Sequence, residues 1–255
     1  MGIIFASLMM FVNAIENYKQ ALEIFRAIGD RREQANILSL MGNVYLLMKQ
    51  IKSDIECEEQ SRIIYHEIGD RSSEAKQLDN MGATFIAIGQ ADRAVEYEKQ
   101  ALTISHEIGD RYREAKALGG MGTAYLVLGQ AKSSIDCLEK ALKIFQEIGE
   151  RDQEASILEN IATYYIIHGR KARAIEPCEQ ARIIYREIGR RDKEARVLKS
   201  IGDIYYGINQ LSKAIEVTKE AVLIIDEIGE APGADDIREQ LNNLQKRAAK
   251  KWWLY

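Results

Sequence analysis

The sequence predicts an all-α protein, a right-handed solenoid of antiparallel helix pairs, and three observations favour that fold class. The chain of 255 residues repeats every 40 residues, without gaps, as far as residue 230. Its composition favours helices, because Ala, Leu, Ile, Glu, Lys and Arg are abundant and there are only 2 Pro. Inside each repeat the apolar residues recur at the spacing of one helix face. We expect about five full repeats, an N-terminal half repeat and a C-terminal capping helix.

The repeat consists of columns of similar residues that stand 40 positions apart. An Ile-Gly pair recurs at 28–29, 68–69, 108–109, 148–149, 188–189 and 228–229. A small residue and a leucine form two further columns, Ala35, Ala75, Ala115, Ala155 and Ala195, and Leu38, Leu78, Leu118, Leu158 and Leu198. Such a fixed period indicates a solenoid, because each unit buries its apolar face only by stacking on its neighbours. The units are expected near 1–30, 31–70, 71–110, 111–150, 151–190 and 191–230.

Each unit is predicted to contain two helices, which we call helix A and helix B. In the second unit the apolar spacing predicts helix A from about Arg31 to Met48 and helix B from about Lys52 to Ile68. Glycine marks the turn inside three units, where a helix end favours a left-handed residue, at Gly89, Gly129 and Gly169. The glycines of the Ile-Gly column are expected to end helix B in the same way. The aspartates that follow should cap the next helix A, at Asp30, Asp70 and Asp110.

Both ends depart from the repeat. The first two residues align with the Met-Gly pair of later units, so residues 3–12 are expected to be the tail of a helix A and its turn. Either the start is truncated or mis-assigned, which we favour, or this apolar edge is buried in a homodimer or against another domain. Pro232 and Gly233 break the repeat, and 231–255 should form a capping helix with a basic and aromatic tail. That tail is either a membrane or partner anchor or a frayed helix end.

No motif in the sequence indicates catalysis. The string HEIGDR at 66–71 and 106–111 is interpreted as a helix end followed by a helix start, with both histidines exposed to solvent. No third ligand shares the spacing of these histidines, so no metal is expected. The 3 cysteines fit no disulfide framework, and the glycines at 119–122 lack the strand and lysine of a phosphate loop. We expect a non-enzyme without a cofactor, in a reducing, cytoplasmic compartment.

Two stretches carry a family resemblance, MGATFIAIGQADRAVEYEKQAL at 81–102 and MGTAYLVLGQAKSSIDCLEKAL at 121–142. Each has a small residue in helix A, an aromatic three positions on, a turn glycine and small residues in helix B. This pattern resembles the tetratricopeptide repeat, whose usual period is about 34 residues, in the lengthened form of kinesin light chains, Pins-type adaptors and bacterial arrays. Pro177 departs from the pattern and should bend its helix or cost about 3 kcal/mol. Polar residues depart from it at Asp54, Ser61, Arg62 and Arg182.

The resemblance implies a protein-interaction scaffold that binds a peptide or helix of a partner in a concave groove lined by A helices. Family members use an asparagine beside the helix A glycine to hold a peptide main chain, and three asparagines match those positions. Three cations would add a basic strip, with Asp79, Glu159 and Asp203 interleaved, so a purely acidic ligand is not demanded. The predicted groove residues are Asn43, Lys76, Asn80, Lys116, Thr123, Asn160, Thr163, Arg196 and Asp203.

The sequence also bears on other partners and functions. A net charge of -4 argues against a nucleic-acid partner, and the apolar N-terminus is too short to span a membrane. Two alternative functions stay open. The array could space or oligomerise larger parts, self-associating as a homodimer through its apolar N-terminal edge. It could also be the regulatory segment of a larger multidomain enzyme.

Overall fold

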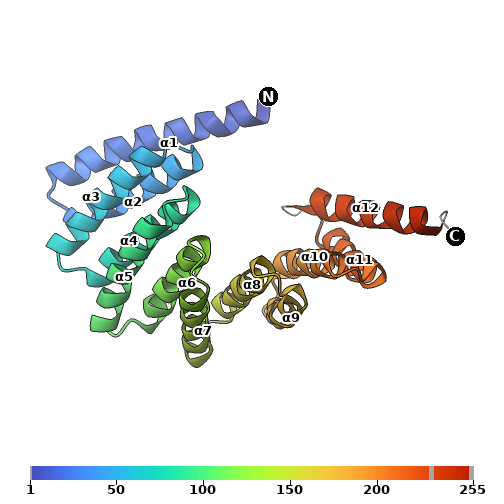
Figure 1. The fold of residues 1–255 in the computed structure, drawn as a ribbon. Coiled ribbons are helices and arrows are strands. Elements are labelled where there is room, and N and C mark those ends of the chain that lie inside the picture. Colours follow the sequence, from blue (N-terminus) through green and yellow to red (C-terminus); the bar gives the residue numbers. More distant parts are fainter. Residues whose placement is uncertain (1, 230–232, 253–255) are drawn as a thin grey trace. The chain divides into compact units, whose positions relative to one another are not determined.

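The computed structural model describes residues 2–229 and 233–252, with side chains over 9–229 and 233–249, and these residues form twelve helices and no strand (Figure 1). The helices are α1 (Gly2–Ala27), α2 (Arg31–Leu47), α3 (Ile51–Glu67), α4 (Arg71–Ala87), α5 (Ala91–Glu107), α6 (Arg111–Val127), α7 (Ala131–Ile148), α8 (Arg151–Ile167), α9 (Lys171–Glu187), α10 (Arg191–Gly207), α11 (Leu211–Ile228) and α12 (Ala234–Trp252). The predicted all-α helical repeat is therefore confirmed. Of the predicted break at Pro232 and Gly233, Gly233 is described and has a φ of 82°, whereas residues 230–232 and the last tail residues, 253–255, lie outside the described residues.

The helices divide into two compact units, and the boundary between Cys137 and Leu138 falls inside α7. We describe each unit by itself. In the N-terminal unit the A helices are α2, α4 and α6, and the B helices packed beside them are α1, α3 and α5. In the C-terminal unit α8 and α10 are A helices, α9 and α11 are B helices, and α12 packs against α11. Short connections make consecutive helices antiparallel. The helices predicted near 31–48 and 52–68 are found as α2 and α3.

The turn inside each repeat after the first depends on one left-handed residue. Gly89 has a φ of 76°, and the next amide, Gln90 N, donates to Phe85 O at 2.8 Å. This pairing satisfies a carbonyl at the end of helix A that would otherwise lack a partner. Lys49 and Asn209 stand at the same position in their own repeats, with φ of 59° and 63°. In these two repeats the left-handed conformation is therefore kept although glycine is absent.

The junction between units explains the HEIGDR string. The Asp70 carboxylate accepts from the Ser73 amide at 3.1 Å and so caps α4, as predicted. Arg71 donates to Glu74 at 2.6 Å and to Glu107 at 3.0 Å, which links the start of α4 to the end of α5. The His66 side chain is 63% exposed. The string therefore ends one helix, caps the next and supplies the arginine whose ion pairs join α4 to α5.

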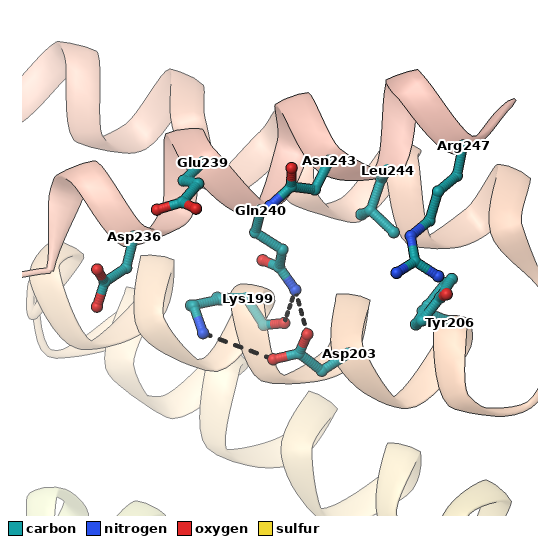
Figure 2. A pocket seen from close by; sticks show the side chains of 9 residues that line it. All are labelled: Lys199, Asp203, Tyr206, Asp236, Glu239, Gln240, Asn243, Leu244 and Arg247. Atoms are coloured by element: carbon teal, nitrogen blue, oxygen red, sulfur yellow. Dashed lines mark hydrogen bonds and ion pairs between the residues drawn. The ribbon is translucent and has the colours of Figure 1, made fainter. Parts of the chain in front are cut away.

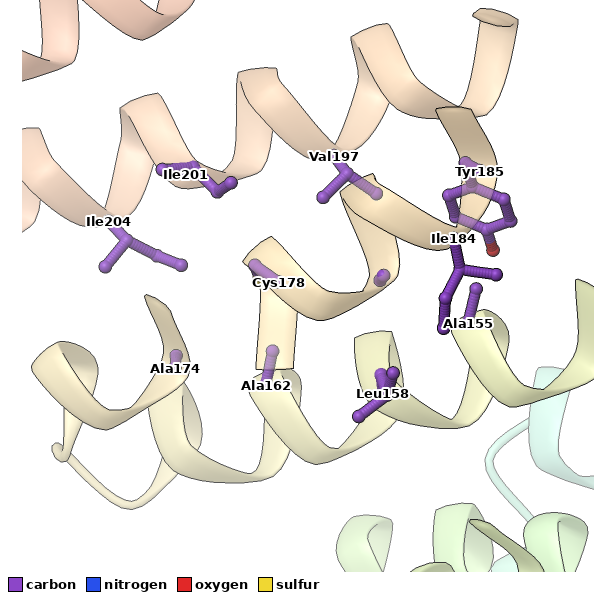
Figure 3. Packing of buried hydrophobic residues seen from close by; sticks show 11 residues of the cluster. Ala155, Leu158, Ala162, Ala174, Cys178, Ile184, Tyr185, Val197, Ile201 and Ile204 are labelled. Atoms are coloured by element: carbon purple, nitrogen blue, oxygen red, sulfur yellow. The ribbon is translucent and has the colours of Figure 1, made fainter. Parts of the chain in front are cut away.

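Small residues let the helices of each pair approach closely. In the C-terminal unit Ala155 and Ala162 of α8 belong to the same cluster as Ala174 and Ala181 of α9, and none of the four is more than 2% exposed. Larger side chains from α9 and α10, such as Tyr185, complete the cluster (Figure 3). The predicted packing columns thus form the core.

The first repeat, near residues 1–30, differs from the sequence prediction. We expected a helix tail and a turn within residues 3–12, but α1 is one helix through that stretch. Met9 and Met10 stand where Gly89 and Gln90 form the turn of a later unit. Methionine favours a helix and is strained in the left-handed conformation, so the helix continues. Ile15 and Leu22 of α1 are buried with residues of α2 and α3, as expected for a B helix.

Pro177, which was expected to bend its helix or to destabilise it, lies inside a continuous helix. The helix α9 continues through it, and the Pro177 ring is buried. The first turn of α9 is tighter than its counterparts, because Arg173 N donates to Arg170 O at 2.8 Å. In α5 the corresponding bond spans one residue more, from Ala94 N to Gln90 O at 3.1 Å. A tightened first turn accommodates a proline that cannot donate to the carbonyl four residues back.

Candidate functional site

The candidate site is the solvent-facing side of the A helices, which we call the A-helix face. In the N-terminal unit Asn43 and Lys76 are exposed on this face, and Asn80, Lys116 and Thr123 are half-buried. In the C-terminal unit Thr163, Arg196 and Asp203 are exposed and Asn160 is half-buried. The structure therefore distributes the predicted groove residues over two faces, one in each unit.

Ion pairs join successive A helices across each face. In the N-terminal unit Lys116 Nζ of α6 lies 3.4 Å from Asp79 Oδ2 of α4. In the C-terminal unit Arg196 of α10 lies 3.4 Å from Glu159 Oε1 of α8, which also accepts from the Tyr185 hydroxyl at 2.6 Å. Lys116 and Arg196 of the predicted basic strip are thus each paired with an acidic residue of the preceding helix A. Such exposed pairs contribute at most about 1 kcal/mol, so a ligand can exchange with either partner.

Three of the predicted groove residues direct their side chains inward or along their own helix. They are Asn80, Thr123 and Thr163. The Asn80 side chain faces the buried Glu58 carboxyl group of α3 and partly offsets the rise in its pKa. The Thr123 hydroxyl donates to Gly119 O at 3.1 Å, and the Thr163 hydroxyl donates to Glu159 O at 3.0 Å. Asn80 therefore supports the interior of its unit as well as lining the face.

A pocket of about 340 Å³ lies on the A-helix face of the C-terminal unit, between α10 and α12 (Figure 2). Gln240 Nε2 of α12 donates to Asp203 Oδ1 at 2.6 Å and to Lys199 O at 3.2 Å, which ties the two helices together. The Arg247 guanidinium lies 5.0 Å from the centre of the Tyr206 ring. The pocket is lined by Lys199, Asp203, Tyr206, Asp236, Glu239, Gln240, Asn243, Leu244 and Arg247.

The contribution of α12 to this pocket was not predicted from the sequence, where the helix was expected only as a cap. A signal was available. Gln240 stands 40 positions after Ser200 and so continues the column that includes Asn80 and Asn160. The helix thus occupies the register of one more helix A, although the Ile-Gly column ends at 228–229.

Three buried carboxyl groups lie inside the N-terminal unit, on Asp54, Glu58 and Glu98, each at most 1% exposed. Burial, and then the nearby Asp54, raise the pKa of Glu58 to about 8. Burial also raises the pKa of Asp54, which accepts a hydrogen bond from the Thr84 hydroxyl at 3.0 Å. One oxygen of each carboxyl group is buried without a hydrogen-bond partner. Helical periodicity alone did not predict this acidic interior.

Two searches of the described residues bear on other functions. Within residues 2–229 and 233–252, no helix is long and apolar enough to cross a membrane. Across the same residues, no group of three or more His, Cys, Asp or Glu side chains is placed to hold a metal ion.

Comparisons with known proteins agree with this fold. The helix pairs, the left-handed turns and the small-residue columns define a helical-repeat protein. A family model described as a tetratricopeptide repeat matches residues 113–187. No curated protein matches the sequence. The resemblance to the tetratricopeptide repeat is therefore confirmed, by sequence over the matched residues and by the fold of similar structures.

Three solved structures illustrate that likeness. BtubC (BKLC) of P. vanneervenii is 17% identical with a TM-score of 0.75, and the match covers 87% of this chain and 94% of that one. A kinesin light chain-like protein of Podosopora anserina with nearly identical TPR-like repeats is 17% identical, with a TM-score of 0.60 over 71% of this chain and 90% of that one. A Rap protein complexed with competence and sporulation factor is 18% identical, with a TM-score of 0.64 over 98% of this chain and 74% of that one. Likeness at these identities shows the fold.

Proposed function

We propose that this chain is a non-catalytic protein-interaction scaffold whose A-helix faces bind an extended segment of a partner protein. The observation that carries the proposal is the pocket between α10 and α12, because it opens on the A-helix face and contains a predicted groove residue, Asp203. The similar Rap structure is a complex with competence and sporulation factor, which adds support from the fold.

The pocket lining favours a peptide with groups of both signs. Lys199 and Arg247 supply cationic donors, whereas Asp203 and Glu239 supply acceptors. An extended peptide brings one free amide and one free carbonyl per residue, and these need partners of both kinds. Leu244 and Tyr206 add apolar surface for a side chain of the ligand. We therefore expect a partner segment that is neither purely acidic nor purely basic.

Selection from a phage-displayed library of random peptides about twelve residues long tests this proposal. Selected peptides should bind Lys199→Glu at least about tenfold more weakly than wild type. The substitution removes a cation from the pocket lining and puts a negative charge near Asp203, whose carboxylate lies 3.6 Å from Lys199 in wild type. Lys219→Glu is the matched control, since Lys219 is an exposed lysine on the B helix α11. Failure to select any peptide, or equal binding by Lys199→Glu and wild type, would contradict the proposal.

A second candidate function is self-association through α1. Ile24 and Ile28 are 59% and 67% exposed at the end of this helix and the link that follows, and Met10 is 71% exposed. Neighbouring exposed apolar side chains favour burial against a second copy. If the chain is a dimer of this kind, Ile24→Glu with Ile28→Glu should halve its mass in sedimentation equilibrium. Leu223→Glu, at a 63% exposed leucine of α11, should leave the mass unchanged. A wild-type monomer refutes this candidate.

A further inference from the structure

Glu98 extends from α5 to the backbones of two A helices, α4 and α6. A Cβ atom on Gly120 would lie 2.1 Å from Glu98 Oε1 and 2.9 Å from Oε2, and one on Gly82 would lie 2.5 Å from Oε1. Only glycine leaves room for the carboxyl group at these two positions. Gly120 weakens α6 by about 1 kcal/mol relative to alanine, and its close approach to Glu98 explains its presence there.

Within the described part of the chain the Glu98 carboxyl group forms no ion pair, because the cation that faces it is paired with another carboxylate. Two charged groups face it, Asp79 of α4 and Lys116 of α6, and they are paired with each other at 3.4 Å. Glu98 is 1% exposed, and its Oε2 is buried without a hydrogen-bond partner. Burial, and then Asp79, raise the pKa of Glu98 well above its ordinary range, whereas Lys116 opposes the shift. An unpaired carboxyl group of this kind is costly to bury and is stabilised by any cation that reaches it.

The preceding repeat provides a direct comparison. Glu58 stands 40 positions before Glu98 and is also 1% exposed. Asn80 stands 40 positions before Gly120, and its side chain faces Glu58, where it partly offsets the rise in the pKa of that carboxyl group. At Glu98 no side chain takes that place, because residue 120 is a half-buried glycine on the A-helix face. Of these two buried carboxyl groups, Glu98 therefore lacks the amide side chain that faces Glu58.

We propose that the A-helix face of the N-terminal unit holds a subsite for one basic side chain of the partner, which enters over Gly120 and pairs with the Glu98 carboxylate. The occupant is an arginine or lysine, because Glu98 offers an acceptor and a negative charge. Arginine fits better, since its planar fork can pair with both oxygens and is more weakly hydrated than an ammonium group. This inference rests on the proposed function for the identity of the occupant, but the subsite can be tested without any partner protein.

Binding of a cation should be linked to release of a proton. In the empty protein Glu98 holds its proton over a wider pH range than an ordinary glutamate does. A guanidinium group beside it favours the ionised form, so the proton passes to solvent as the ion pair forms. The affinity for the cation should therefore rise with pH while Glu98 is still protonated in the empty protein.

An NMR titration with N-acetylarginine amide tests the subsite, using the backbone amide signals of Gly82 and Gly120. The neutral isostere N-acetylcitrulline amide serves as the second probe, and each is titrated at about pH 6 and about pH 8. Glu98→Gln removes the charge with little change in size. Glu58→Gln makes the same change at the position that Asn80 faces and is the matched control. Circular dichroism establishes equal helicity of the variants.

The expected result is a saturable shift of both glycine signals with the arginine probe, tighter at the higher pH and absent with the citrulline probe. Glu98→Gln should weaken binding by at least about tenfold, and Glu58→Gln should leave it unchanged. Equal shifts with the two probes, no saturable shift at either pH, or wild-type affinity in Glu98→Gln would overturn the proposal. The citrulline comparison uses wild-type protein alone and so does not depend on a variant. A negative result here would leave the peptide selection at the α10–α12 pocket unaffected.

Discussion

Replacing Glu58 by glutamine is expected to stabilise the protein in a strongly pH-dependent way. The ordinary pKa of this carboxyl group is 4.5, and burial in the N-terminal unit raises it to about 8. Between these values the folded protein keeps a proton that the unfolded chain releases, so the free energy of unfolding falls as the pH rises. At about 1.4 kcal/mol for each pH unit, the loss reaches about 3 kcal/mol at pH 7 and about 4 kcal/mol at pH 8. Below pH 4.5 both states are protonated and the loss disappears.

Glutamine has the shape of the protonated acid and retains a polar group that faces Asn80, but it never ionises. The Glu58→Gln variant should therefore match wild type near pH 4 and exceed its stability by about 3 kcal/mol near pH 7. Urea unfolding followed by circular dichroism at several pH values measures this difference. Groups that do not interact with Glu58 contribute equally to both proteins and cancel in the comparison.

Glu56 provides the control for this experiment. It lies on the same helix but is exposed, and its nearest cation is Lys52 at 3.8 Å. The Glu56→Gln variant should follow wild type within about 0.5 kcal/mol at every pH. If Glu58→Gln also follows wild type between pH 4.5 and pH 8, the carboxyl group is not held in a dry interior and the reasoning fails.

Two further predictions concern the frame of the repeat. Asp70→Ala should lower the free energy of unfolding by about 1 kcal/mol, because the amide of Ser73 loses its cap. Arg190 stands in the same column but makes no side-chain cap bond, so Arg190→Ala should cost less than about 0.5 kcal/mol. Equal losses in urea unfolding would refute the role of the cap. Gly120→Ala should cost about 1–3 kcal/mol in wild type, because the new Cβ meets Glu98, but should gain about 1 kcal/mol when Glu98 is alanine. A double-mutant cycle measures this reversal of sign, and purely additive effects would show that the contact is absent.

The fold was predictable because local signals agree in each repeat. Turn glycines such as Gly89 and caps such as Asp70 specify where helices end and begin, and the small-residue columns specify which faces meet. The same logic accounts for the failure at the N-terminus. There the period predicted a turn, but Met9 and Met10 lack the local preference for one, and local preference decided the outcome.

The candidate site was less predictable, because it depends on contacts between repeats. Counting columns placed Asn80 and Lys116 on the A-helix face, where the structure also has them. It did not reveal that Asn80 faces the Glu58 carboxyl group or that Lys116 is paired with Asp79, since each contact joins neighbouring helices of different repeats. The role of Gln240 could have been found by continuing the 40-residue count past residue 230.

The buried acids also set the order in which parts of the protein open. Glu58 and Glu98 fill the interior column that holds Leu138 and Cys178 in the C-terminal unit. In a repeat array each part opens according to its own interfaces, and a protease cuts the part that opens most often. Alkaline conditions should therefore expose the N-terminal unit first and leave the C-terminal unit as a resistant fragment. The pH around the protein would then determine how long the N-terminal unit resists proteolysis relative to the C-terminal unit.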